Sequence, residues 1–122
     1  MTNPSKSKGT AAETAVVNYL RHWSTHVERR ALSGSADKGD VSGIIGAVVE
    51  IKACKAMELS GWIKEADTER ENAGASFAAV WHKRRGKSSP ADWFVTMTGA
   101  DFAHLLIEAG RLIVNASNEE GS

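Results

Sequence analysis

The chain has 122 residues, of which 42% are hydrophobic and 25% are charged, as in an ordinary globular protein. This length predicts one domain over residues 9–114, between a flexible arm at 1–8 and a flexible tail at 115–122. Fifteen basic and fifteen acidic residues give a formal net charge of zero, so overall charge neither indicates nor excludes a polyanionic partner. No apolar run is long enough to span a membrane, and a single cysteine, Cys54, excludes an internal disulfide, which favours a reducing cytoplasm.

The first predicted element is a helix from Thr10 to about Trp23. Thr10 is a favourable N-cap, and Glu13 follows it by three residues, the spacing of a capping box. Val16, Leu20 and Trp23 recur at helical spacing and predict a buried face. Glu13 is therefore open to two interpretations, as a helix cap or as part of a site.

A short strand and a loop follow the first helix. Residues 27–32 have strand character, and residues 33–39 have the composition of a loop. Loops beside a hydrolytic centre often hold substrate, and lysines in a terminal arm can contact a phosphate backbone. The candidate phosphate-binding residues in this part of the chain are Lys6, Lys8, Arg29, Arg30, Ser33 and Ser35. A solvated tail, an edge strand and an ordinary turn explain the same residues equally well.

Residues 40–45 and 47–52 are predicted as two short strands that meet at a glycine. Because strand side chains alternate between faces, Glu50 and Lys52 share one face with Val48, and the other face carries Val49, Ile51 and Ala53. Asp40 comes close to Glu50 if the two strands pair as a hairpin. Two carboxylates and a lysine that converge on one point suit a divalent metal in hydrolytic chemistry. A surface ion network is the alternative, although an idle charge in an apolar strand is costly.

A second helix is predicted from about Leu59 to Asn72, with Gly74 as its C-cap. The acidic residues of that helix are expected in solvent: Glu65, Asp67, Glu69 and Glu71. Residues 75–82 and 93–97 then predict a β-hairpin, and a last helix opens after it. The hairpin turn carries four positive charges, those of Lys83, Arg84, Arg85 and Lys87. Because like charges so close repel, the turn predicts contact with the phosphates of DNA. A loop that only promotes solubility is the alternative.

Asp40, Glu50 and Lys52 resemble the signature of the PD-(D/E)xK nuclease superfamily, an Asp, a short spacer, and Glu-x-Lys on a strand. Gly39 departs from that pattern, because Pro is usual before the Asp. Glu13 falls where the archaeal-type Holliday junction resolvases carry a further acid, and the Gly-Ser segment at 30–35 also resembles that branch. The resemblance covers roughly residues 8–107. It implies an α/β fold with a mixed β-sheet flanked by helices, a restriction-endonuclease-like core in the order αβββαββα.

The same resemblance implies a Mg²⁺-dependent endodeoxyribonuclease, in which Mn²⁺ is expected to substitute. Asp40, Glu50 and the backbone carbonyl of Ile51 would hold the metal, and Glu13 would complete the coordination. Lys52 would lie beside the attacking water and stabilise charge in the transition state. Asp37 is an alternative to Asp40 as a ligand, but Asp40 opens the apolar strand whereas Asp37 lies in the loop.

Three functions are compatible with these residues: a Holliday junction resolvase, a nuclease of the same fold with another DNA specificity, and an inactive DNA-binding module. Two symmetric nicks in a junction predict a homodimer, with Phe102, Leu106 and Ile107 of the last helix as the candidate contact. The chain is too short for a separate target-recognition domain, which favours reading of DNA shape. Its small size is typical of a prokaryotic or phage protein.

Overall fold

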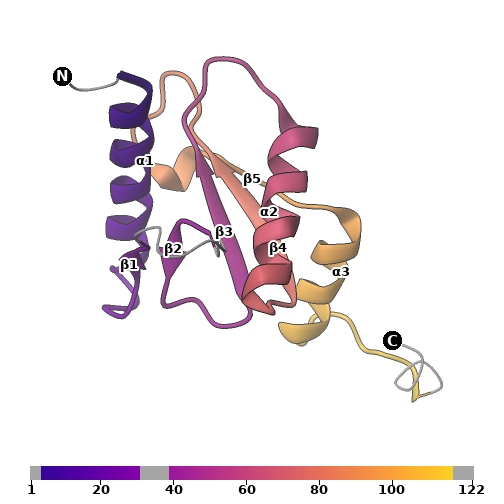
Figure 1. Ribbon diagram of the computed structural model, residues 1–122. Coiled ribbons are helices and arrows are strands. Elements are labelled where there is room, and N and C mark those ends of the chain that lie inside the picture. The colour runs from indigo at the N-terminus through magenta and orange to yellow at the C-terminus, as the bar shows by residue number, and fades with distance from the viewer. Residues whose placement is uncertain (1–3, 31–38, 117–122) are drawn as a thin grey trace.

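The structure is a computed structural model that describes residues 4–30 and 39–116, with side chains from residue 8 onward. Its elements are α1 (Pro4–Leu20), β1 (Glu28–Arg29), β2 (Val41–Ser42), β3 (Ala47–Lys52), α2 (Leu59–Ala73), β4 (Phe77–His82), the 3-10 helix η1 (Pro90–Asp92), β5 (Phe94–Thr96) and α3 (Gly99–Glu108). Apart from η1, the helices and strands follow the predicted order. The chain is an α/β protein with a mixed sheet and helices on its faces (Figure 1).

The central sheet contains three strands in the order β3-β4-β5. β3 and β4 pair in parallel, with Glu50 opposite Val80, whereas β4 and β5 form the predicted antiparallel hairpin. β1 and β2 form a separate two-stranded antiparallel sheet. The predicted hairpin between residues 40–45 and 47–52 is therefore wrong, because β2 pairs with β1 and β3 pairs with β4.

Two helices cover opposite faces of β3 (Figure 1). The predicted alternation of side chains explains this arrangement. Ile51 packs with Val16 of α1 in one core cluster, and Val48 packs with Trp62 of α2 in the other. Glu50 points to the same face as Val48 and therefore lies on the α2 side of the sheet. β3 is buried between the two helices, so any charge on its central residues has little contact with solvent.

α1 begins at Pro4 and not at Thr10, since proline is tolerated in the first turn of a helix, where its missing N–H is not needed. Residues 4–8 of the arm predicted at 1–8 lie in this helix. Glu13 lies in the middle of α1, and this position excludes the capping-box interpretation. Trp23 lies beyond the end of α1 and is exposed, contrary to the predicted buried face. Four predicted residues fall outside what the structure describes: Ser33, Ser35, Asp37 and the side chain of Lys6.

The last two helices differ in how they are attached to the sheet. α2 packs across β3 and β4 and ends, as predicted, at Gly74, which adopts a left-handed conformation with φ of 65°. α3 contacts β4, but none of its residues is fully buried, and Phe102 is 49% exposed. Of the three predicted contact residues, Phe102 and Ile107 are exposed and Leu106 is half-buried. Within the described ranges, no helix has both the length and the hydropathy needed to cross a bilayer.

Candidate metal centre

The candidate centre lies at the open edge of β3, where the backbone around Asp40 runs alongside the strand. The Asp40 N–H donates to the Val49 carbonyl at 3.2 Å, and the Ile51 N–H donates to Oδ2 of Asp40 at 2.8 Å. The Asp40 carboxylate thus accepts the hydrogen bond that a backbone carbonyl of a neighbouring strand would accept in a β-sheet. Asp40 reaches β3 through these bonds, although the hairpin that was expected to bring it there does not form.

Gly39 explains why this chain lacks the proline expected before the aspartate. Its φ of 97° lies in the left-handed region, and a Cβ atom added to it would lie 2.8 Å from Cγ1 of Val48. Proline fixes φ near −65° and could not adopt this conformation. Gly39 therefore allows the close approach that places Asp40 against β3.

Asp40, which is half-buried, and Glu50, which is buried, form a carboxyl pair. Glu50 is 4% exposed, and its carboxyl is joined to that of Asp40 by a hydrogen bond. Burial, and then the neighbouring Glu50, raise the pKa of Asp40 to about 8; burial also raises the pKa of Glu50 to about 8, with Glu69 adding to the effect. Two carboxyls can share a hydrogen bond only while one of them is protonated. A bound cation would relieve the same repulsion without the proton.

Lys52 contacts this group from the end of β3. Its Nζ donates to Oε1 of Glu65 on α2 at 2.7 Å. Burial opposes the charge of Lys52, but the carboxyls of Glu65, Glu50 and Asp40 outweigh that effect and raise the pKa of Lys52. The side chain is therefore held as an ammonium group next to the carboxyl pair.

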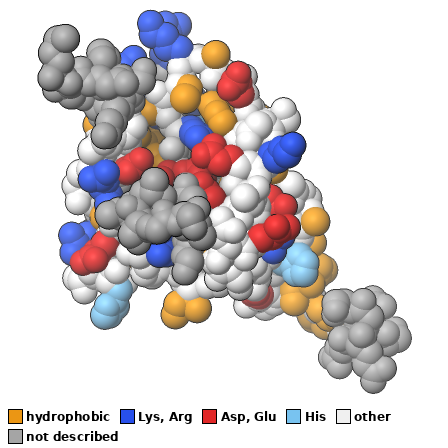
Figure 2. Space-filling view, in the orientation of Figure 1, with side chains coloured by type: hydrophobic (Ala, Val, Ile, Leu, Met, Phe, Trp, Pro, Cys, Tyr) orange, Lys and Arg blue, Asp and Glu red, His pale blue; other side chains and the backbone are white. Residues whose placement is uncertain are grey.

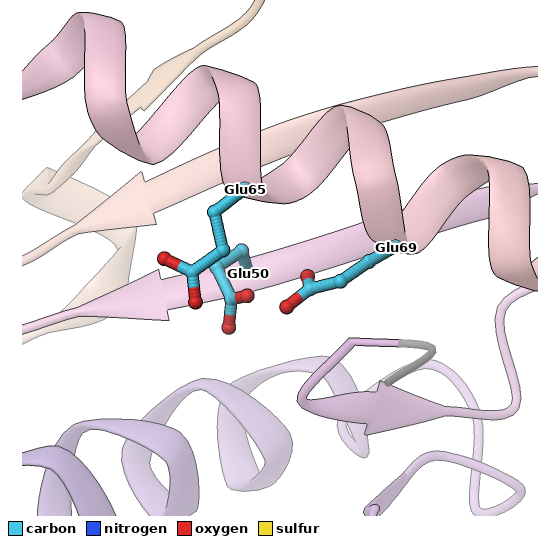
Figure 3. Close-up of side chains that lie close together, drawn as sticks. All are labelled: Glu50, Glu65 and Glu69. Carbon is cyan, nitrogen blue, oxygen red and sulfur yellow. The ribbon is translucent and has the colours of Figure 1, made fainter. Parts of the chain in front are cut away.

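Two acidic residues of α2 complete the cluster and were not predicted. One carboxylate oxygen from each of Glu50, Glu65 and Glu69 lies within 4.8 Å of the others, and the three side chains converge between α2 and β3 (Figure 3). Glu69 is only 2% exposed, so the expectation that the acids of α2 lie in solvent is wrong for this residue. The sequence did contain a signal, since Trp62, Ala66 and Glu69 follow the spacing of one buried helix face.

Glu13 lies at the margin of the centre. Its Oε1 accepts a hydrogen bond from Nε of Arg29 on β1 at 3.1 Å. Burial and then Asp40 raise the pKa of Glu13, while Arg29 and Lys52 act in the opposite direction. Glu13 therefore interacts electrostatically with the residues it was predicted to join, although its nearest partner is Arg29.

The open edge of β3 also contains a backbone oxygen. The N–H and C=O of one strand residue point to the same edge, and the Ile51 N–H points to Asp40. The Ile51 carbonyl consequently faces Asp40 and not β4. Together with Oε2 of Glu50, which is buried and accepts no hydrogen bond among the described residues, this gives a set of hard oxygen donors. Mg²⁺ and Mn²⁺ prefer such donors, so the residues fit a divalent cation.

Apart from Lys8, which lies in α1, the predicted DNA-binding residues with described side chains fall into two groups. Arg29 and Arg30 adjoin the centre, since Arg29 pairs with Glu13 and the Arg30 N–H donates to the Asp40 carbonyl at 2.8 Å. The second group lies on the β4–β5 turn: Lys83, Arg84, Arg85 and Lys87.

Comparisons with protein-family models, with curated proteins and with solved structures gave no match. Function has therefore to be inferred from the side chains themselves.

Proposed function

We propose that this protein is a metal-dependent DNA endonuclease whose active site contains Asp40, Glu50 and Lys52. The observation that carries the proposal is the pair formed by half-buried Asp40 and buried Glu50 beside the Lys52 ammonium group. Burying two like charges together destabilises a fold, and carboxyls with strongly raised pKa values cluster at functional sites. The resemblance to the PD-(D/E)xK pattern implies that these three residues act together in metal-dependent hydrolysis of a phosphodiester bond.

Asp40, Glu50 and the Ile51 carbonyl would hold the metal, and Glu13, which interacts electrostatically with Asp40, would act through a water molecule. When bound, Mg²⁺ or Mn²⁺ would lower the pKa of a water molecule and offset charge on the scissile phosphate. The buried Oε2 of Glu50, which accepts no hydrogen bond from the described residues, is an oxygen that the bound metal would contact. Metal binding would also release the proton that Asp40 and Glu50 share, so affinity for the metal should rise with pH.

The remaining groups act on the substrate. The raised pKa of Lys52 keeps it protonated near neutral pH, so it would contribute positive charge to the transition state and would not remove a proton from water. Glu65 orients the Lys52 ammonium group through their contact of 2.7 Å. Arg29 and Arg30, next to Glu13 and Asp40, would contact phosphates that flank the scissile bond.

The resemblance points to branched DNA, with the four-way junction as the first substrate to test. A two-fold dimer would place two equivalent sites on a two-fold substrate. The apolar surface of α3 and of the segment after it supports such a dimer, because Phe102, Ile107 and Leu112 are all exposed in the single chain. Light scattering at micromolar concentration should show a dimer. A monomer both free and on a junction would contradict this part of the proposal.

The direct test compares cleavage of an end-labelled four-way junction, a linear duplex and a single strand in Mg²⁺, in Mn²⁺ and in EDTA. The junction should be cleaved in either metal and not in EDTA, and Asp40→Asn should abolish cleavage. Asp67→Asn is a matched control, because Asp67 is an exposed acid that pairs only with Arg70 among the described residues. Equal cleavage of the linear duplex would indicate another specificity. Junction binding without cleavage in either metal would indicate an inactive module and refute the endonuclease.

A further inference from the structure

A cavity of about 630 Å³ opens between the start of α1, the segment after β3 and the β4–β5 turn. Five cations line it: Lys8, Lys55, Lys83, Arg84 and Arg85. Among the described residues, no acid lines the cavity, and no ion pair joins any of the five to a carboxylate. In a chain with a formal net charge of zero, this is a strong local excess of positive charge. Such an excess favours a ligand that carries several negative charges.

An aromatic ring lies at the same cavity. Phe94 on β5 is 55% exposed, and the guanidinium of Arg84 lies 4.2 Å from the centre of its ring. Nη1 of Arg84 donates to the Asp92 carbonyl at 2.8 Å, which holds the guanidinium in place against the ring. An arginine fixed over one face of an exposed aromatic side chain presents a planar guanidinium on which a flat aromatic ligand can stack.

The cavity continues to the candidate metal centre. A second cavity, of about 580 Å³, shares Lys8, Cys54 and Lys55 with the first and extends to Ile51 and Lys52. The two therefore form one path from the end of β3 to the β4–β5 turn, which we call the basic groove. A ligand that fills the basic groove lies close to Lys52 at one end and to Phe94 at the other.

We propose that the basic groove binds an unpaired DNA strand, with its phosphates on the five cations and one base stacked at Phe94. The ligand must combine repeated negative charge with an exposed aromatic face, and a single strand has both. A duplex presents phosphates but keeps its base faces stacked inside. An acidic peptide has the charge and lacks regular aromatic faces. The claim that the bound strand leads to a cleavage site rests on the proposed endonuclease. The claim that the groove binds the strand does not rest on it. The preferred substrate would then be a branched DNA with an unpaired arm.

The test is a binding measurement in EDTA, so that cleavage plays no part. Fluorescence anisotropy should show that a short oligothymidylate binds more tightly than a duplex of equal length. Phe94→Leu keeps an apolar side chain but removes the stacking surface, and it should weaken oligothymidylate binding by about tenfold. Trp23→Leu is the matched control, because Trp23 is a 68% exposed aromatic residue beyond α1 and does not line the groove. Equal losses in the two variants, or no loss in Phe94→Leu, would overturn the proposal.

Cys54 allows a second measurement on the unaltered chain. It is the single cysteine of the sequence, it is exposed, and it lines both cavities. Bound oligothymidylate should slow its reaction with a maleimide, whereas thymidine monophosphate at the same nucleotide concentration and polyglutamate should not. Protection by polyglutamate equal to that by DNA would show that charge alone is read and would refute the stacked base. If oligothymidylate binds and protects while no metal supports cleavage, the endonuclease proposal fails and the strand-binding groove stands.

Discussion

The candidate metal centre and the basic groove meet at Lys52, yet they handle charge in opposite ways. In the centre, carboxyls lie buried against one another, and their pKa values rise. In the groove, the five cations other than Lys52 have no carboxylate partners among the described residues. Acidic side chains gather between α1 and α2 on the face seen in Figure 2, with Lys and Arg side chains around them. A net charge of zero thus conceals two regions of opposite sign, each of which favours a different partner.

Because the two regions hold their charges differently, the centre and the groove should respond to different solution conditions. Buried carboxyls destabilise the fold when they ionise, so the centre should respond to pH and to divalent cations. Exposed cations cost the fold little, and their attraction for a polyanion is screened by salt, so the groove should respond to ionic strength. Variants of one region should leave the property of the other unchanged.

The largest expected effect is the loss of DNA cleavage in the Glu50→Gln variant. Even residues that only support a metal ligand cost tenfold to a hundredfold when replaced, so loss of a ligand should lower the cleavage rate by more than about a hundredfold. Binding of DNA in EDTA should stay within about twofold of the unaltered protein, because Glu50 does not line the basic groove. Single-turnover cleavage and anisotropy measure the two quantities. A Glu50→Gln protein that cleaves normally would remove the centre from the chemistry.

The second prediction concerns stability in the absence of metal. Below about pH 4 the carboxyls of Asp40 and Glu50 are protonated in both the folded and unfolded states. Between there and about pH 8 they ionise in the unfolded state while the folded state keeps them protonated. Because the folded pKa values are raised, the free energy of unfolding should fall across this range, by on the order of a few kcal/mol.

Thermal unfolding in EDTA should therefore show a Tm that decreases by about 10 °C from pH 5 to pH 8. Glu50→Gln should flatten this dependence, because a neutral amide has no proton to lose. Millimolar Mg²⁺ should raise the Tm at pH 8 more than at pH 5, since the metal binds the ionised carboxyls. A Tm that rises steadily with pH in EDTA would contradict the buried pair.

The sequence predicted the parts of this centre that depend on local pattern. Alternation along β3 placed Glu50 and Lys52 on one face, and Gly74 fixed the end of α2. The pairing of β3 with β4 was not predicted, because strand partners depend on how distant segments pack. Glu69 was missed for a similar reason. A glutamate is usually solvated, and only the position of α2 across β3 buries its carboxyl beside Glu50.

The third prediction concerns the groove. Replacing Arg84 and Arg85 with Ala should weaken DNA binding by about tenfold at moderate salt and reduce the slope of log affinity against log salt by about one to two units. Metal dependence of cleavage should not change. Lys87→Ala is a control within the same turn, because Lys87 does not line the groove and should have a smaller effect. A slope unchanged in the double variant would place the DNA elsewhere, along Arg29 and Arg30.

The smallest expected effect is at the contact between the two regions. Glu65 is exposed, and exposed ion pairs contribute little to stability, so Glu65→Gln should leave the Tm nearly unchanged. Its contact of 2.7 Å nevertheless orients Lys52, which lines the groove and adjoins the carboxyl pair. Loss of that orientation should lower the single-turnover rate by about threefold to tenfold, since misplaced catalytic groups lose rate. Glu71→Gln, an exposed change on the same helix, should have no effect. A faster Glu65→Gln protein would show instead that Glu65 competes with the substrate for Lys52.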